Sequence, residues 1–223
     1  GKLAAGVAHE INNPLTGILS YAESISEELD KDHPLQEDIA IIIRETLRCR
    51  DIVRNLLDFA KQYTPKFEVV DPNVIIQQSL DLVRRLPQFK DIEIIVNLSE
   101  KIPKIKADVK QIQQVLLNFL INAADAMKYK GEIIITSEYY RQQKKCIISV
   151  EDSGPGIPEN LMDKIFEPFF STKSTSGLGL AVSWGIIERH HGTIEVDTAS
   201  SGGAIFKIVL PAYFESEKNE LES

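Results

Sequence analysis

The stretch VAHEINNPLTGILSYAESISEEL, residues 7–29, places apolar side chains at alternating steps of three and four residues. Residues 35–60 repeat this spacing after a short polar break at 30–34. Such spacing is typical of helices that pack along a coiled-coil seam. A single helical hairpin cannot enclose its own seam, whereas two hairpins can do so as a four-helix bundle. We therefore predict that residues 1–63 form a helical hairpin that dimerises with a second copy of the chain.

The pattern changes after residue 63. Residues 64–66 are expected to be a linker, and residues 67–213 alternate helix and strand patterns with two hairpins. That mixture is typical of a two-layer α/β sandwich, so the whole chain is predicted to be of the α+β class. The polar tail, residues 214–223, is expected to be disordered. Expected helices cover 72–86, 109–127 and 178–190, and expected strands cover 92–98, 133–140, 146–151, 193–198 and 204–210.

Bulk composition narrows the function. The formal net charge of -8 over 223 residues argues against a nucleic-acid partner, because a phosphate backbone requires a basic face. No apolar run reaches the roughly 20 residues needed to cross a bilayer. Cys49 and Cys146 match no metal spacing, so the expected setting is cytoplasmic. The helical pattern is already present at the first residues, so we expect an upstream sensor domain to precede this chain. The full-length protein could be a membrane-anchored sensor of which this chain is a cytoplasmic portion.

His9 is the first candidate for chemistry. An imidazole on a helix can act as a nucleophile near neutral pH, and the adjacent Glu10 could act as its base or fix its tautomer. Pro14 removes one helical hydrogen bond and favours a bend one turn further on. The alternative is a solvated histidine beside an incidental proline. A zinc protease helix is excluded, because no second histidine follows four residues later.

Asn118 and Asn122 lie one helical turn apart within the apolar run 115–124. Asn is a poor helix former, and burying its amide without partners is costly. Two amides on one helix face suit a hydrated Mg²⁺ and the triphosphate that it carries, with Asn122 as the metal ligand. The alternative is a pair of amides bonded inside the core.

Asp152 ends an expected strand just before Gly154 and Gly156. A carboxylate at that place can accept a hydrogen bond from an exocyclic amine such as that of adenine, and glycines allow the backbone to approach closely. Most sequences of this kind are simple turns, so this motif is weak when taken alone.

A second glycine segment opens the helix expected at 178–190. Gly177 and Gly179 place backbone N–H groups at a helix N-terminus, where phosphate binds well. The preceding segment 166–173 is first aromatic and then polar, and we interpret it as a lid whose Lys173 could reach a phosphate. The alternative for its phenylalanines is core packing, which we also expect for at least one of them.

In their order and spacing, these segments resemble the motifs of the two-component sensor histidine kinases, over residues 1–213. The residues within the H, N and F motifs are most similar to those of the nitrogen-sensor subgroup. The matching motifs are the H box at 9–15, the N box at 118–122, the G1 box at 152–156, the F box at 166–170 and the G2 box at 177–180. The resemblance implies a dimerisation and histidine-phosphotransfer domain at 1–63, followed by a catalytic ATP-binding domain of the Bergerat (GHKL) fold at 67–213.

The resemblance also implies a mechanism with ATP and Mg²⁺. His9 would take the γ-phosphoryl group and pass it to an Asp of a response-regulator receiver domain, and Asn13 would orient water for dephosphorylation of the regulator. The implied nucleotide-binding residues are Asn118, Asn122, Asp152, Gly154, Gly156, Lys173, Gly177, Leu178, Gly179 and Leu180.

Two positions depart from the family pattern. Asp125 stands where many members carry Lys, so charge neutralisation would come from Mg²⁺, Lys173 or Lys128. Thr175 and Ser176 precede Gly177 where a further glycine is usual, which predicts an altered lid.

Other functions within the same fold remain as alternatives. An ATP-hydrolysing switch would carry a Glu where this chain has Asn118, which favours phosphoryl transfer over hydrolysis. A serine kinase of this fold would lack the histidine-bearing hairpin. A dimeric scaffold that only binds nucleotide is a further alternative. We expect His33, His190 and His191 to be structural and Trp184 to lie in the core.

Overall fold

The computed structural model describes residues 2–30, 32–60, 64–171 and 177–214, with the backbone alone for 2–9, 51–52 and 54–60. The chain divides into two compact units. Residues 1–64 and 165–182 form the first unit, and residues 65–164 and 183–223 form the second. The tail predicted to be disordered lies outside the described residues from residue 215 onwards, so its disorder stays a prediction.

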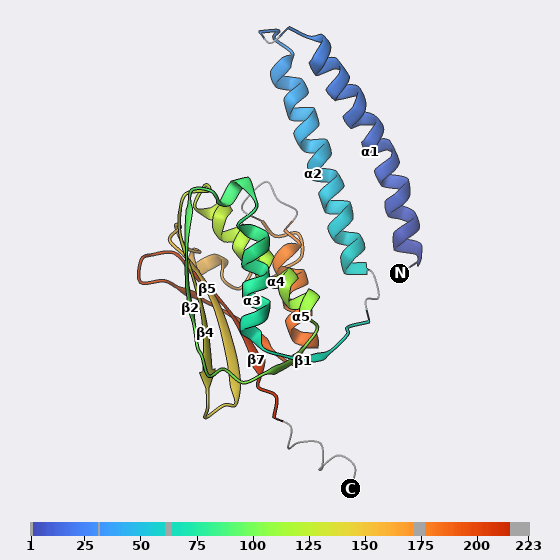
Figure 1. The fold of residues 1–223 in the computed structure, drawn as a ribbon. Helices are drawn as coiled ribbons and strands as arrows, with labels where there is room; N and C mark the ends of the chain where they lie inside the picture. Colours follow the sequence, from blue (N-terminus) through green and yellow to red (C-terminus); the bar gives the residue numbers. More distant parts are fainter. Residues whose placement is uncertain (1, 31, 61–63, 172–176, 215–223) are drawn as a thin grey trace. The chain divides into compact units, whose positions relative to one another are not determined.

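The first two helices form the predicted hairpin. Helix α1, Lys2–Glu28, packs antiparallel to α2, Gln36–Ala60 (Figure 1). The Gln36 amide nitrogen donates to the backbone oxygens of Ser26, at 2.9 Å, and Leu29, at 3.1 Å. These bonds satisfy carbonyl groups that the end of a helix leaves without helical partners. The first residue of α2 therefore caps the C-terminal end of α1.

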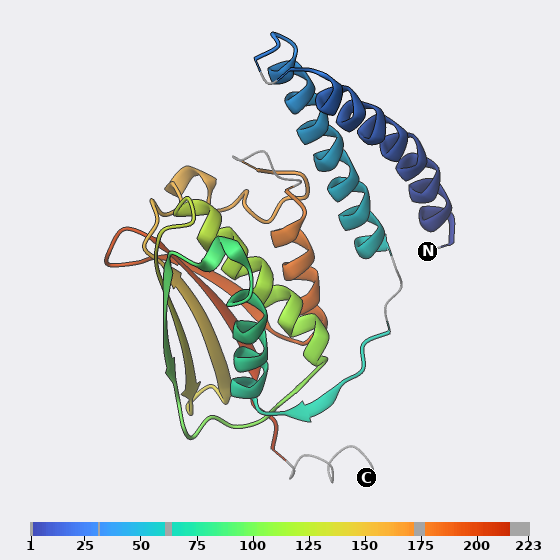
Figure 2. The same cartoon turned by 45° about the horizontal axis from the view of Figure 1, so that its top comes forward.

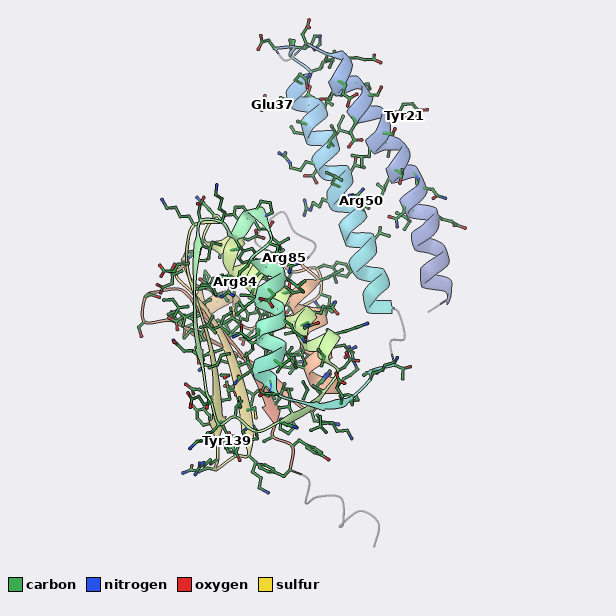
Figure 3. The ribbon with its side chains drawn as sticks, viewed as in Figure 1. Tyr21, Glu37, Arg50, Arg84, Arg85 and Tyr139 are labelled. Carbon is green, nitrogen blue, oxygen red and sulfur yellow. The ribbon has the colours of Figure 1, made fainter. Side chains whose placement is uncertain are left out.

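Only part of the apolar seam is covered within one hairpin. Ala22, Ile39 and Val53 are buried, whereas Ile18, Ile25 and Ile42 keep 48, 44 and 45% of their surface exposed. Tyr21 points away from α2 and is 76% exposed (Figure 3). The exposed part of the seam is the surface that a second hairpin would cover.

The second unit is built on a five-stranded sheet in the order β2-β4-β5-β7-β6. Strand β2 runs parallel to β4, and the other neighbouring pairs are antiparallel. Helices α3, α4 and residues 183–189 of α5 cover one face of the sheet (Figures 1 and 2). The bounds are β2 Ile92–Leu98, β4 Gly131–Tyr140, β5 Lys145–Asp152, β6 Thr193–Thr198, β7 Ala204–Pro211, α3 Pro72–Val83, α4 Val109–Ala126 and α5 Gly179–Arg189.

The core lies between that sheet face and the helices. Alternate residues of β5 are buried, as expected for a sheet with one covered face. The ring of Phe119 on α4 packs against the ring of Phe206 on β7, and the two ring centroids are 4.9 Å apart. The side chains buried to less than 2% exposure include Ile75, Ile76, Leu80, Ile112, Leu116, Phe119, Leu120, Ile133, Ile135 and Ile148.

The predicted elements are present, with three differences. Helix α3 ends at Val83 rather than near residue 86, because Pro87 opens a short 3₁₀ turn, Pro87–Phe89. Two three-residue strands, β1 Glu68–Val70 and β3 Ile105–Ala107, pair antiparallel and were not predicted. A further 3₁₀ turn covers Glu159–Leu161.

Trp184 was expected in the core, and this expectation is wrong. Its side chain is 43% exposed, because the buried face of α5 consists of Ser183, Ile186 and Ile187 and Trp184 lies off that face. None of the helices within the described residues has the length and apolar character needed to span a membrane.

His190 is structural, as expected. It is 2% exposed at the end of α5. Its Nε2 accepts the backbone N–H of Asp108 at 3.0 Å, and its Nδ1 stands 2.8 Å from the carbonyl of Ile186. Because Nε2 accepts, the proton of the neutral ring resides on Nδ1, which donates to Ile186. The buried ring is therefore neutral in the folded chain.

This arrangement predicts a pH-dependent stability. Burial lowers the pKa of His190 below 6.5, Arg189 and His191 lower it further, and the Ile186 carbonyl and Asp108 partly oppose them. The unfolded chain then binds a proton that the folded chain excludes, so the free energy of unfolding falls as the pH drops below 6.5 towards the lower folded-state pKa.

Urea unfolding between about pH 7.5 and about pH 5.5 measures this effect. His190→Gln, which keeps an acceptor near Nε2, should flatten the pH dependence. The matched control is His191→Asn, which tolerates the φ of 57° there and should keep most of the pH dependence, because burial of His190 is the largest cause of its lowered pKa. An equal slope in His190→Gln and the parent chain would contradict the assignment.

Candidate nucleotide and phosphoacceptor sites

Helix α4 carries the two amides of the N box on the edge of its buried face. The helix begins after Asp108, whose side chain accepts the backbone N–H of Gln111 at 3.1 Å. Asn118 and Asn122 are both partly exposed, one turn apart. The Nδ2 of Asn118 donates to the hydroxyl of Ser183 on α5 at 3.0 Å. One half of the Asn118 amide, its nitrogen, is therefore bonded inside the protein, as the alternative interpretation expected. This hydrogen bond also fixes the orientation of the Asn118 amide oxygen.

Asp152 is buried at the end of β5, with 4% of its surface exposed. Its Oδ1 accepts the backbone N–H of Gly154 at 2.8 Å and that of Ala204, the first residue of β7, at 3.4 Å. Hydrogen bonds to backbone N–H groups stabilise a carboxylate and fix its rotamer. The structure thus holds Asp152 in one orientation at the point where β5 gives way to the G1 loop.

The glycines around Asp152 permit this close packing. A side chain on Gly203 would collide with the backbone oxygen of Asp152, and one on Gly156 would collide with the carbonyl of Gly202. Gly156 also adopts φ +70°, a conformation that side chains disfavour. Gly202 and Gly203 belong to the same loop cluster but were predicted only as a hairpin turn, because their proximity to Asp152 depends on the pairing of β5 with β7.

The G1 loop packs against the end of α4, so the two motifs meet. A side chain on Gly154 would stand 3.4 Å from the Cβ of Ala126, one turn after Asn122. The Ser153 hydroxyl donates to the Met127 sulfur at 3.2 Å and accepts the backbone N–H of Glu132 at 2.9 Å. The structure therefore brings the amides of α4 and the carboxylate of β5 to the same end of the sandwich.

Asp125, which departs from the family pattern, lies in the last turn of α4. Asp125 accepts a hydrogen bond from the Tyr129 hydroxyl, and this bond and the negative charge of Asp125 raise the pKa of Tyr129 above 10.0. Lys128, proposed as an alternative cation, is exposed beside it. No cluster of three His, Cys, Asp or Glu side chains suited to a metal occurs among the described residues.

The F box and the G2 box belong to the other unit and contact each other through their described residues. The N–H of Phe169 donates to the carbonyl of Gly177 at 3.1 Å, which joins the end of the F box to the start of the G2 box. Gly177 has φ +64°, and a side chain there would stand 2.6 Å from backbone atoms of Phe169 and Phe170. Phe169 is 63% exposed, so it is not the core residue of the segment, whereas Ile165 is buried.

The G2 residues Gly177, Leu178, Gly179 and Leu180 lie at the beginning of α5, as expected. Leu178 is buried, and its carbonyl accepts the N–H of Val182. Lys173, which was predicted to reach a phosphate from the lid, lies outside the described residues. Its contact with phosphate therefore stays a prediction.

The H box lies on α1. Glu10 and Asn13 are exposed, and Pro14 is inside the helix. His9 is described as a helical backbone position only, one turn before Asn13. Thr16 donates its hydroxyl to the Asn12 carbonyl at 2.9 Å, a bond typical of helices with a disturbed hydrogen-bond ladder.

Comparisons with known proteins match both parts of the chain. Residues 1–63 match the His Kinase A (phospho-acceptor) domain family, and residues 107–213 match the Histidine kinase-, DNA gyrase B-, and HSP90-like ATPase family. Among curated proteins, the signal transduction histidine-protein kinase AtoS of Escherichia coli is 37% identical over 95% of this chain and 34% of its own length. The sensor histidine kinase ZraS of the same organism is 37% identical over 95% of this chain and 45% of its own length. The chain thus spans less than half the length of these relatives.

Solved structures give the same result. The catalytic domain of the histidine kinase ThkA is 34% identical, with a TM-score of 0.60 over 66% of this chain and 98% of that domain. ThkA in complex with the response regulator TrrA is 34% identical, with a TM-score of 0.71 over 96% of this chain and 62% of that one. Full-length ShkA in complex with AMPPNP has a TM-score of 0.72 at 27% identity, over 95% of this chain and 46% of that one. With its predicted fold confirmed, the chain belongs to the sensor histidine kinases and forms their catalytic core, a His Kinase A domain joined to an ATPase-type domain.

Proposed function

We propose that this chain transfers the γ-phosphoryl group of ATP to His9 and then to an Asp of a response-regulator receiver domain. The Asp152 carboxylate carries the nucleotide part of the proposal. It is buried, and two backbone N–H groups hold it at the end of β5. A carboxylate in this position suits the exocyclic amine of adenine.

The amides of α4 suit the polyphosphate. With its nitrogen donating to Ser183, Asn118 offers its amide oxygen to the ligand. Asn122 is the candidate protein ligand for Mg²⁺, an ion that typically combines one or two protein oxygens with substrate phosphates and water. Bound there, Mg²⁺ would neutralise charge on the phosphates. The backbone N–H groups of Gly177 and Gly179 are suited to phosphate oxygens, since Gly179 begins α5 and Gly177 lies two residues before it.

The transfer step itself is a displacement at phosphorus. A ring nitrogen of His9 forms a bond to the γ-phosphorus while the bond to the bridging oxygen of ADP breaks. Glu10, exposed on the next position of α1, accepts or orients the ring proton. Such reactions depend on positioning and charge stabilisation rather than on covalent chemistry by the protein.

Three further assignments extend the proposal. The half-exposed seam of the hairpin supports a homodimer. The residues of the H, N and F boxes support membership of the nitrogen-sensor subgroup. The cytoplasmic setting, with an upstream sensor domain, stays a prediction from the sequence.

Incubation with ATP and Mg²⁺ tests the central proposal. We expect a phosphorylated chain whose label is stable in base and lost in acid, and no label in His9→Ala. A label that resists acid would indicate Ser or Thr phosphorylation instead. Tight ATP binding without any label would support the dimeric scaffold, and ADP release without label would support the ATPase switch.

We further infer that Asn13 orients water for dephosphorylation of the regulator. Asn13 is exposed one turn after His9 on α1. Asn13→Ala should slow dephosphorylation of the phosphorylated regulator by about tenfold or more. The control is Ser20→Ala, an exposed polar residue further along the same helix. Equal rates in the two variants would exclude this role.

A further inference from the structure

The last residue of the linker, Lys66, is held by Asp108 of the second unit. The backbone N–H of Lys66 donates to Asp108 Oδ2 at 2.6 Å. The other carboxylate oxygen caps α4 by accepting the N–H of Gln111. One buried side chain, 2% exposed, therefore both begins the helix that carries the N box and holds the incoming chain.

His190 completes this attachment from the end of α5. Its Nε2 accepts the backbone N–H of Asp108 at 3.0 Å, and its ring lies 4.9 Å from that of Phe67. Lys66 and Phe67 are thus held by groups at the start of α4 and the end of α5. These two helices meet again further along, where Asn118 bonds to Ser183.

Strand pairing continues the attachment on the C-terminal side of Phe67. Glu68 pairs with Ala107 and Val70 pairs with Ile105, so β1 is in register with the residues directly before Asp108. A two-strand ribbon of three residues each is weak by itself. The contacts of Asp108 and His190 therefore stabilise the end of the β1–β3 pair that lies next to Phe67.

We propose that Asp108 and His190 are positioning residues that clamp the linker at Lys66 and Phe67, and so set the length of chain between the histidine-bearing hairpin and the catalytic domain. This inference rests on the proposed kinase function for its consequence, although the clamp itself does not. From Ala60, where α2 ends, to Lys66 the chain can extend at most about 22 Å in any conformation.

Loss of the clamp has a calculable effect. Two more residues would join the connecting chain before Glu68. Once the connecting chain can span the two sites, the effective concentration of one domain near the other falls roughly with the −3/2 power of the connecting length, which corresponds to at least about 1.5-fold here. The nucleotide residues are untouched, so the effect should appear in kcat for autophosphorylation and not in KM for ATP.

Asp108→Asn is the sharpest variant. The amide keeps one oxygen to cap α4, where Asn is a good N-cap residue. Its NH₂ group replaces the oxygen that faces the Lys66 N–H, and two donors then oppose each other. The matched control is Asp71→Asn, because Asp71 caps a different helix, α3, in the same way, through the N–H of Asn73.

Hydrogen exchange of the Lys66 amide, followed by NMR in the whole chain, is the first measurement. We expect exchange to accelerate by at least about tenfold in Asp108→Asn, as for loss of a hydrogen bond to a charged group, and to stay unchanged in Asp71→Asn. Unchanged Lys66 exchange in Asp108→Asn would overturn the clamp, whether or not the chain is a kinase.

Autophosphorylation kinetics are the second measurement. Asp108→Asn should lower kcat by at least about 1.5-fold with an unchanged KM for ATP. Faster Lys66 exchange with parental kcat would overturn the positioning role and leave the kinase function intact. No phosphorylation in the parent chain would instead refute the proposed function.

A second pair of variants is available if Asp108→Asn fails to fold. Phe67 is 40% exposed, so Phe67→Ala removes its contact with His190 without opening the core. Phe67→Tyr keeps the ring and should restore both the slow exchange of Lys66 and kcat. Equal behaviour of Phe67→Ala and Phe67→Tyr would contradict the role of the ring contact.

Discussion

The carboxylate of Asp152 is the constraint on which the nucleotide site depends. It ends β5, accepts backbone N–H groups from Gly154 and Ala204, and is nearly inaccessible to solvent. Burying a carboxylate costs free energy unless hydrogen bonds compensate, and these backbone donors provide the compensation. The loops on both sides must then approach so closely that Gly156 and Gly203 leave no room for side chains. The glycines of the G1 motif therefore have a packing role in addition to any contact with a ligand.

Helix α4 links this carboxylate to the rest of the second unit. It lies in the connection between the parallel strands β2 and β4, which need such a crossover because they run in the same direction. Its start is capped by Asp108, its middle is joined to α5 through Asn118 and Ser183, and its end supports the G1 loop. The end of the linker is thus held at the start of α4, the amides lie on α4, and the loop that follows Asp152 packs against its end.

Much of this fold was predictable from sequence because its elements are long and periodic. Strand β2 was predicted to the residue, and α4 within one residue, since Asp108 is a strong cap signal. Strands β1 and β3 were missed, because three residues give too few alternations to show a period. Trp184 was misplaced because a large apolar side chain on an amphipathic helix was assumed to face inward.

The candidate site was predictable residue by residue but not in its connections. Asn118, Asn122 and Asp152 stand out through residue type and spacing. The bonds from Asn118 to Ser183 and from Asp108 to His190 join residues distant in sequence, and only the folded chain shows them. Ser183 carries no local signal of its own, since a serine within a helix is common.

Asp152 should recognise the exocyclic amine of the purine, and nucleotide binding measures this recognition. The binding of ATP can be compared with that of inosine triphosphate, which carries an oxygen in place of the amine, in the parent chain and in Asp152→Asn. We expect the parent chain to bind ATP at least about tenfold more tightly than inosine triphosphate, and Asp152→Asn, whose NH₂ can donate to that oxygen, to lose this preference. Equal binding of the two nucleotides by the parent chain, or the same preference in both chains, would contradict it.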